Sequence, residues 1–205
     1  MTRKLGKTLW MYDVIYSNIT DALVDDGYII IPHAVSSILS KNLINIAKKS
    51  KNFKHAGISA RKKINPNTRR DKILWLNHDK SVQSEFIDFA DGLKDYLNRE
   101  LFTCITYFES HFSLYEHGDF YATHYDAFKN SVNRIVTIVY YLNEEWDEKS
   151  GGELVIYDDE NELIKKIIPH ADTLVVFLSD KFPHEVLPTK RKRYSIAGWF
   201  RVDKI

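Results

Sequence analysis

The stretch FTCITYFESHFSLYEHG, residues 102–118, decides the fold class of this chain. Its polar and apolar residues alternate, which is the period of a half-buried β-strand. We therefore expect the chain to change from helices to strands near Leu101. Turn-forming segments such as EEWDEKSGG and LPTKRK separate further strand candidates. These candidates span residues 134–142, 153–157, 162–168, 173–178 and 194–202.

The first hundred residues favour helices, with one short β-rich run, YIIIP, at residues 28–32. Apolar residues recur at helical spacing in three segments: residues 9–24, from Val35 onward and after Ser81. Gly27 is placed to cap the first helix in the left-handed conformation. The pattern predicts one α+β, mainly β domain over residues 1–205. A jelly-roll core would span roughly residues 101–203, with a helical support over roughly 1–100.

Composition narrows the classes of protein that the chain can represent. The net charge is +1, so the whole molecule has no general attraction to nucleic acid or to a membrane. No run of 18 apolar residues occurs. Cys104 is the one cysteine, so an intrachain disulfide is impossible and a reducing, cytoplasmic location is expected. Its place in an apolar alternation predicts a buried packing thiol.

The sequence His-x-Asp occurs three times, at residues 117–119, 124–126 and 170–172. Two such residues on a strand point to the same side and can share one metal. The first copy is centred on a glycine, and the third lies in a turn only 14 residues before His184. The copy at 124–126 leaves 58 residues before His184, enough for several strands to return to one site. We therefore expect His124, Asp126 and His184 to hold one iron, with the opposite face open for substrate and oxygen.

Arg193 follows His184 by nine residues, in a predicted strand. Strand alternation places Arg193, Ser195 and Trp199 on one face. A guanidinium and a hydroxyl that point together suit one carboxylate, so a carboxylate-bearing co-substrate is expected beside the metal.

A strongly basic segment, residues 48–72, lies between the predicted helices and has two interpretations. One is a solvated, mobile loop, because it lacks sustained periodicity. The other is a lid or arm that grips the substrate, because long segments of this kind in compact domains are usually functional or disordered. The sequence does not decide between them.

The strings YYLNEEWD, SGGEL, PHEV and RYSIAGWF closely resemble the iron(II)- and 2-oxoglutarate-dependent oxygenases. Within them the chain looks most like the prolyl hydroxylases related to the animal oxygen-sensing enzymes, in a minimal, bacterial-type form. The resemblance covers residues from about Gly27 to Asp203 and includes TRRDKILWL at residues 68–76. It implies the double-stranded β-helix fold, with Fe(II) and 2-oxoglutarate as cofactor and co-substrate and L-ascorbate as a reductant.

The resemblance also implies roles for single residues. His124, Asp126 and His184 would ligate iron, and Arg193, Tyr141 and Ser195 would bind the distal carboxylate of 2-oxoglutarate. Further residues would surround them: Tyr115 and Leu154 at the co-substrate, and Trp199, Arg134 and Asp71 at the substrate. Asp71 and Arg134 are interpreted either as a pair at the base of the basic segment or as unrelated surface charges. Strand faces bearing Ile138, Leu154 and Val176 are expected to exclude water from the iron.

The implied function is hydroxylation of a prolyl residue in a protein, with release of succinate and carbon dioxide. In animals such enzymes act on a hypoxia-inducible transcription factor, and bacterial relatives act on elongation factor Tu, so a translation factor is one expected partner. A nucleic-acid demethylase is disfavoured, because that branch carries a second arginine where this chain has Trp199. Two alternatives stay open: a hydroxylase of another residue or of a small molecule, and an inactive metal-binding β-barrel module. The oligomeric state is not predicted.

Overall fold

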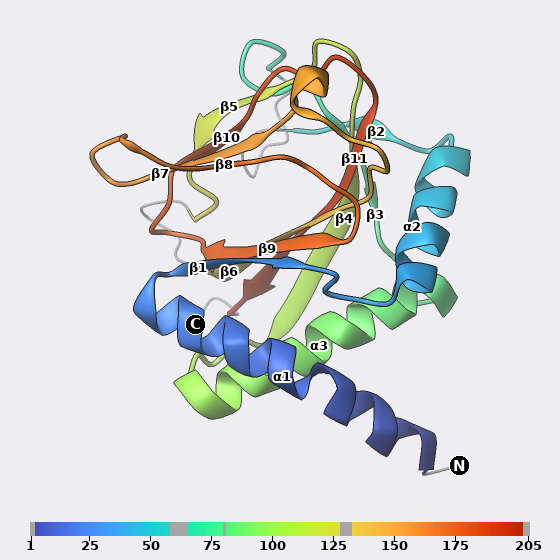
Figure 1. Cartoon of the computed structure of the whole chain (residues 1–205), viewed down its shortest axis with the longest axis vertical. Coiled ribbons are helices and arrows are strands. Elements are labelled where there is room, and N and C mark those ends of the chain that lie inside the picture. Colours follow the sequence, from blue (N-terminus) through green and yellow to red (C-terminus); the bar gives the residue numbers. More distant parts are fainter. Residues whose placement is uncertain (1–2, 58–64, 80, 128–132, 203–205) are drawn as a thin grey trace.

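The computed structural model describes residues 3–57, 65–79, 81–127 and 133–202. Three layers make up the molecule: a small sheet, a large sheet and a layer of helices (Figure 1). The helices are α1 (Arg3–Asp25), α2 (Ser37–Lys49) and α3 (Ser81–Leu101), with a short 3-10 turn, η1 (Glu148–Ser150). The strands are β1 (Tyr28–Pro32), β2 (Lys54–His55), β3 (Lys72–Trp75), β4 (Tyr107–Tyr115), β5 (Tyr121–His124), β6 (Arg134–Tyr141), β7 (Leu154–Tyr157), β8 (Leu163–Ile167), β9 (Thr173–Leu178), β10 (His184–Val186) and β11 (Arg193–Arg201).

Both sheets are antiparallel throughout the described residues. The large sheet has the order β1-β9-β6-β11-β4-β3-β2, and the small sheet has the order β5-β10-β7-β8. Consecutive strands are often not neighbours, so the chain crosses between the sheets as it does in a jelly roll. The predicted mainly β core with supporting helices is therefore confirmed. None of the helices among these residues is long and apolar enough to cross a membrane.

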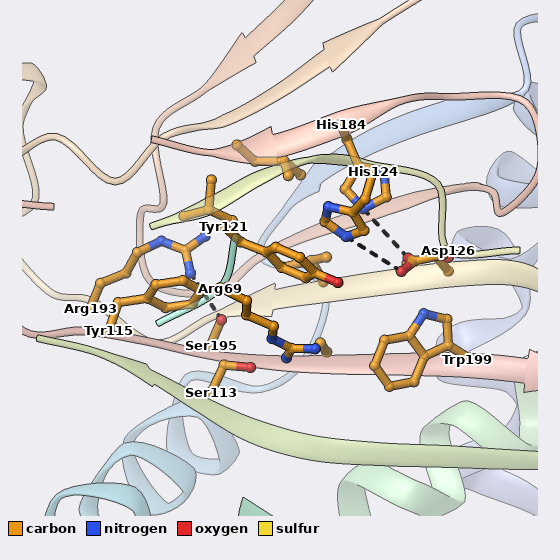
Figure 2. A pocket seen from close by; sticks show the side chains of 15 residues that line it. Arg69, Ser113, Tyr115, Tyr121, His124, Asp126, His184, Arg193, Ser195 and Trp199 are labelled. Atoms are coloured by element: carbon orange, nitrogen blue, oxygen red, sulfur yellow. Dashed lines mark hydrogen bonds and ion pairs between the residues drawn. The ribbon is translucent and has the colours of Figure 1, made fainter. Parts of the chain in front are cut away.

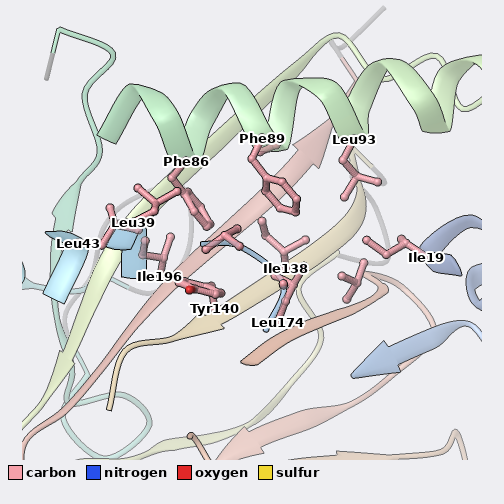
Figure 3. Close-up of a cluster of buried hydrophobic side chains, with 14 of the residues drawn as sticks. Ile19, Leu39, Leu43, Phe86, Phe89, Leu93, Ile138, Tyr140, Leu174 and Ile196 are labelled. Carbon is pink, nitrogen blue, oxygen red and sulfur yellow. The ribbon is translucent and has the colours of Figure 1, made fainter. Parts of the chain in front are cut away.

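The alternation along β11 and β6 builds the core on one face of the large sheet and the pocket on the other. Ile196 and Ile138 are fully buried toward the helices. Figure 3 shows Phe86, Phe89 and Leu93 of α3 packed against that face. At roughly 25 cal/mol for each Å² of apolar surface buried, a fully buried side chain of this size contributes about 1.5–3 kcal/mol. The helical layer thus buries one face of the sheet that carries the site.

Four strands were not predicted: β2, β3, β5 and β10. β1, β2 and β3 belong to the large sheet, so the first hundred residues are not only a helical support. β5 and β10 have four and three residues, too few for a clear alternation. β3 lies at the end of the basic segment, where charged neighbours hide its apolar residues.

The strand predicted from residue 102 begins only at Tyr107, and Cys104 is exposed, so the predicted buried thiol is wrong. The side chain of Asn98 causes the difference. Its amide donates to the carbonyl of Ile105 (2.8 Å) and accepts from the amide N–H of Ile105 (2.7 Å). The chain curls around it with Phe102 and Cys104 at positive φ. This turn places Cys104 outside the sheet.

The described ends of the basic segment are anchored, while its residues 58–64 lie outside the described part. Lys54 pairs with Ile73, and the N–H of Ala122 in β5 donates to the carbonyl of Thr68 (2.8 Å). The interpretation as a mobile loop is therefore wrong for residues 65–72. Residues 65–71, called the arm below, lie next to β5 and are hydrogen-bonded to it.

His111 of β4 is buried between two aromatic rings, those of Trp75 and Trp199, with centroids at 5.2 and 5.3 Å. Burial, with smaller contributions from the guanidinium groups of Arg69 and Arg134, lowers the pKa of His111 to about 4, although the carboxylate of Asp71 acts in the opposite direction. The folded protein therefore holds a neutral imidazole that becomes protonated near pH 6.5 in the unfolded chain.

Since the unfolded state binds more protons between these two pKa values, stability falls as the pH is lowered from about 6.5 toward 4. We expect His111→Asn to remove about 2 kcal/mol of the stability difference between pH 7.5 and pH 5. Urea denaturation of the metal-free protein at both pH values measures it. Equal pH dependence in the two proteins would show that His111 does not titrate in this way.

Candidate active site

Two histidines from neighbouring strands and one aspartate from the bend after β5 meet between the two sheets (Figure 2). His124 ends β5, Asp126 follows it, and His184 begins β10, directly opposite His124 in the sheet. Their ligand atoms all lie within 4.8 Å of one another. Nε2 of His124 is 3.7 Å from Asp126, and Nε2 of His184 is 3.5 Å from it. A single metal ion fits between such atoms with one face left open.

The backbone orients both imidazoles. Nδ1 of His124 donates to the carbonyl of Ala122 (2.8 Å), and Nδ1 of His184 donates to the carbonyl of Phe182 (3.0 Å). A carbonyl can only accept, so the proton is on Nδ1 and the lone pair of Nε2 faces Asp126. Thr137 of β6 donates to the carboxylate of Asp126 (2.9 Å). Such outer contacts fix the direction of metal ligands.

The charge state of the three residues also suits a metal. Burial, and then the neighbouring His184, lower the pKa of His124 to about 3, so its imidazole is neutral at pH 7. Burial alone would raise the pKa of Asp126, but His184 and His124 hold it below its ordinary value. Neutral imidazole and ionised carboxylate are the ligand forms.

The other two His-x-Asp copies are structural, as predicted. Asp119 accepts from the N–H of Glu116 (2.8 Å) in a turn at Gly118, whose φ is +85°. Asp172 accepts from the hydroxyl of Tyr140 (2.8 Å) on the face of the sheet that packs against the helices. Among the described residues only the copy at 124–126 joins His184 in a possible metal centre.

Arg193 is almost completely buried, and its guanidinium is held on two sides. Nε donates to the carbonyl of Gly152 (2.7 Å), and Nη1 donates to the hydroxyl of Ser195 (3.2 Å). The rings of Tyr115 and Tyr141 flank it at 5.0 and 5.1 Å. Gly152 is required here, because a Cβ would lie 2.9 Å from Cδ of Arg193 and the residue has a φ of +72°.

Nη2 of Arg193 and the hydroxyl of Tyr141 are among the buried donors that have no hydrogen-bond partner within the described residues. Burial raises the pKa of Tyr141 to about 12, so the hydroxyl keeps its proton. Unpaired buried donors are costly, and one carboxylate could accept from both. Both residues share a face of the large sheet with Ser195, and Arg193, Ser195 and the triad line one cavity. The pocket therefore fits a carboxylate-bearing molecule beside a metal.

The remaining predicted residues fall into two groups. Tyr115, Leu154 and Trp199 line the cavity as expected. Arg134 lies over the ring of Trp199 at 3.9 Å and donates to the backbone carbonyl of Asp126 (3.2 Å). Asp71 does not pair with Arg134: Arg69 holds it through Nε (2.5 Å) and Nη2 (2.9 Å), so the proposed pair is wrong.

Ile138 and Val176 do not face the metal and pack toward the helices instead. The positions of the strands were predicted correctly, but the wrong face was assigned to the metal. On β6, Thr137 and Val139 line the cavity. Counting alternate residues back from Tyr141 would have found both.

Arg69 and Tyr121 were not predicted as site residues, although Arg69 lies in the segment TRRDKILWL. The ring of Tyr121 stacks on His124, with centroids 3.6 Å apart and planes at 16°. Arg69 lies over the same ring at 4.5 Å and is fixed by the buried Asp71. The arm thereby supports a metal ligand through one aromatic ring (Figure 2). This contact depends on a bridge between residues 69 and 121, which no local pattern reveals.

Comparison with known proteins agrees with this geometry. Residues 110–201 match the model of the 2OG-Fe(II) oxygenase superfamily. A crystal structure of a Pseudomonas putida prolyl-4-hydroxylase superposes with a TM-score of 0.84 at 32% identity, covering 92% of this chain and 100% of that one. This chain belongs to the iron(II)- and 2-oxoglutarate-dependent oxygenases. Its fold is their double-stranded β-helix.

Two further proteins resemble this chain. The prolyl hydroxylase of Trichoplax adhaerens, solved with a peptide of the hypoxia inducible factor, has a TM-score of 0.84 at 29% identity and covers 98% of this chain and 93% of that one. Human Egl nine homolog 1 is 42% identical over 85 residues, which are 40% of this chain and 20% of the human protein. The rat protein gives the same match over 25% of its length, so the chain spans a quarter or less of these curated relatives.

The triad and the two unpaired donors thus fit the iron and the 2-oxoglutarate that this family uses. His124, Asp126 and His184 would hold Fe(II), and Arg193 with Tyr141 would hold the distal carboxylate. Leu154 and Val139 supply apolar walls.

We expect His124→Ala and Asp126→Ala to lose Fe(II) binding, because each removes one of three ligands. His117→Ala and His170→Ala serve as matched controls from the other His-x-Asp copies. Equilibrium dialysis followed by metal analysis reads this out without turnover. Loss of iron in the His170 variant, with binding kept in the His124 variant, would overturn the assignment.

Arg193→Ala should weaken 2-oxoglutarate binding while iron still binds. A charge-assisted bidentate contact is worth about 1.5–3 kcal/mol, which is roughly a 10- to 150-fold increase in Kd. Titration calorimetry with Fe(II) present and oxygen absent measures it. Arg191→Ala is the control, since that exposed arginine donates to the carbonyls of Glu144 and Glu145 outside the cavity. Unchanged affinity in the Arg193 variant would contradict the pocket described above.

Proposed function

We propose that this enzyme hydroxylates a prolyl residue in a protein substrate, with 2-oxoglutarate and oxygen as co-substrates. The observation that carries the proposal is the wide groove at the mouth of the metal cavity. Its volume is about 850 Å³, and it shares Arg69 and Trp199 with the cavity. A groove of this size accommodates a polypeptide segment, whereas the metal cavity beside it is much smaller, at about 50 Å³.

The similarity to prolyl hydroxylases supports the same conclusion. The Pseudomonas putida enzyme is covered over its whole length, and the Trichoplax adhaerens enzyme was solved with a protein-derived peptide. A small-molecule substrate has weaker support, because an epimerase of nogalamycin biosynthesis with the same fold is only 12% identical. That likeness concerns the fold alone.

When bound, Fe(II) and 2-oxoglutarate would supply the oxidising chemistry and yield succinate and carbon dioxide. The residues of this chain would do the rest. Arg193, Ser195 and Tyr141 orient the co-substrate by its distal carboxylate. Val139 and Leu154 keep water from the reacting centre. The inactive-module alternative is disfavoured, since it would leave Nη2 of Arg193 and the hydroxyl of Tyr141 buried without a purpose.

The proposal also includes a reductant, a class of substrate protein and a location in the cell. L-Ascorbate as a reductant and a translation factor as the substrate follow from the resemblance of the sequence alone. A cytoplasmic location is supported by the single, exposed cysteine, because a chain without disulfides is typical of a reducing compartment.

Mass spectrometry of proteins from a cell extract treated with the enzyme, Fe(II) and 2-oxoglutarate tests the proposal. We expect the mass of one oxygen atom to be added to proline in a small number of proteins. The His124→Ala variant should add none. Modification of a different residue type, or succinate formation only with a small molecule, would contradict prolyl hydroxylation.

A further inference from the structure

The groove beside the metal cavity has walls of a definite chemical character. Its floor is formed by the end of the large sheet, where β2 is the last strand of the described residues. Its described lining consists of Lys51, Asn52, Phe53, Lys54, His55, Gly57, Arg69, Ile73, Leu74, Trp75, His111, Arg134 and Trp199. None of these residues is acidic, so this surface has one sign of charge.

The charges along the groove are not equivalent. Arg69 is neutralised by Asp71, and Arg134 lies near Glu109 and Asp126. Lys51 and Lys54 are exposed, and the lysine ion pairs of the described residues involve other lysines. The positive charge open to a ligand is therefore at the far end of the groove, away from the metal.

Apolar surface lies between these lysines and the metal. Trp75 is 50% exposed, a high value for a tryptophan, and it stands edge-on against the buried His111. Phe53 lines the same groove and is partly buried. Large exposed aromatic surface of this kind marks a site of contact with another molecule. A ligand that fills the groove would cover the ring of Trp75 and then reach Lys51 and Lys54.

We propose that the substrate is an acidic protein segment that lies extended along this groove. Its target residue would enter the cavity at Trp199, apolar residues would cover Trp75, and aspartates or glutamates would meet Lys51 and Lys54. This inference rests on the proposed function and adds to it the chemical class of sequence beside the target proline. The extended form follows from the path of the groove, since a segment that reaches from Trp199 on β11 to Lys54 on β2 must pass over β4 and β3.

Three labelled peptides that differ only in charge test the inference. Each has one proline, with four glutamates, four glutamines or four lysines on one side and the same neutral residues on the other. Fluorescence anisotropy with the full chain, Fe(II) and 2-oxoglutarate in the absence of oxygen gives the affinities. We expect the glutamate peptide to bind most tightly, the glutamine peptide less tightly and the lysine peptide most weakly. These differences in affinity should shrink as salt is added.

Lys51→Glu combined with Lys54→Glu should weaken binding of the glutamate peptide about tenfold, because two attractive charge pairs become repulsive. The same double variant should bind the lysine peptide more tightly than the original chain does. Lys165→Glu combined with Lys190→Glu is the matched control: these residues are also exposed, lie outside the groove, and give the same net charge. An order of affinities left unchanged by the groove variant, or altered equally by the control, would overturn the inference.

Two further results separate the inference from the function on which it rests. With oxygen admitted, hydroxylation of all three peptides at equal rates would overturn the acidic preference and leave prolyl hydroxylation standing. A glutamate preference in binding without hydroxylation of any proline would contradict the proposed function and support the docking surface. Tighter binding of a poly-thymidine oligonucleotide than of the glutamate peptide would overturn the inference in favour of a nucleic acid.

Discussion

The antiparallel pairing of β5 with β10 is the contact on which the site depends. It places His124 opposite His184, although the two residues are 60 positions apart in the chain. Both strands are short, so their register is held from outside by β7 on one side and by the arm of residues 65–71 on the other. A shift by one residue would turn the ligands away from each other, because side chains alternate across a strand.

The large sheet holds the remaining residues of the site in fixed positions. One face of β11 and β6 packs on the helices, and the other face supplies Arg193, Ser195, Thr137 and Tyr141. The same strands therefore anchor the co-substrate pocket to the hydrophobic core. Thr137 connects the two parts of the site, since it stands on β6 and donates to Asp126. A site that must hold several groups within fractions of an ångström benefits from such a platform.

Much of this was predictable from the sequence, and the failures have physical causes. The long strands β6, β9 and β11 were found because their alternation spans six to nine residues. The triad was found because its spacing selected one His-x-Asp copy of three. The short strands were missed, since three or four residues carry too little pattern. Cys104 was misplaced because a side chain, Asn98, overrides the local alternation.

The partner of Asp71 was missed although it is local: Arg69 lies two residues before Asp71, and residues two apart in an extended segment point to the same side. In the structure Arg69, not Arg134, pairs with Asp71. Arg69 also contacts the ring of Tyr121, which stacks on His124. The arm that borders the groove is thus mechanically connected to a metal ligand. The arm therefore both lines the groove and holds a metal ligand in position.

A crystal structure of the protein with Mn(II) in place of iron and with 2-oxoglutarate tests the central claim most directly. The account predicts one metal ion bound by His124, Asp126 and His184, with the distal carboxylate hydrogen-bonded to Nη2 of Arg193 and to the hydroxyl of Tyr141. A metal bound at another group of residues, or a co-substrate carboxylate that leaves both donors unpaired, would contradict it.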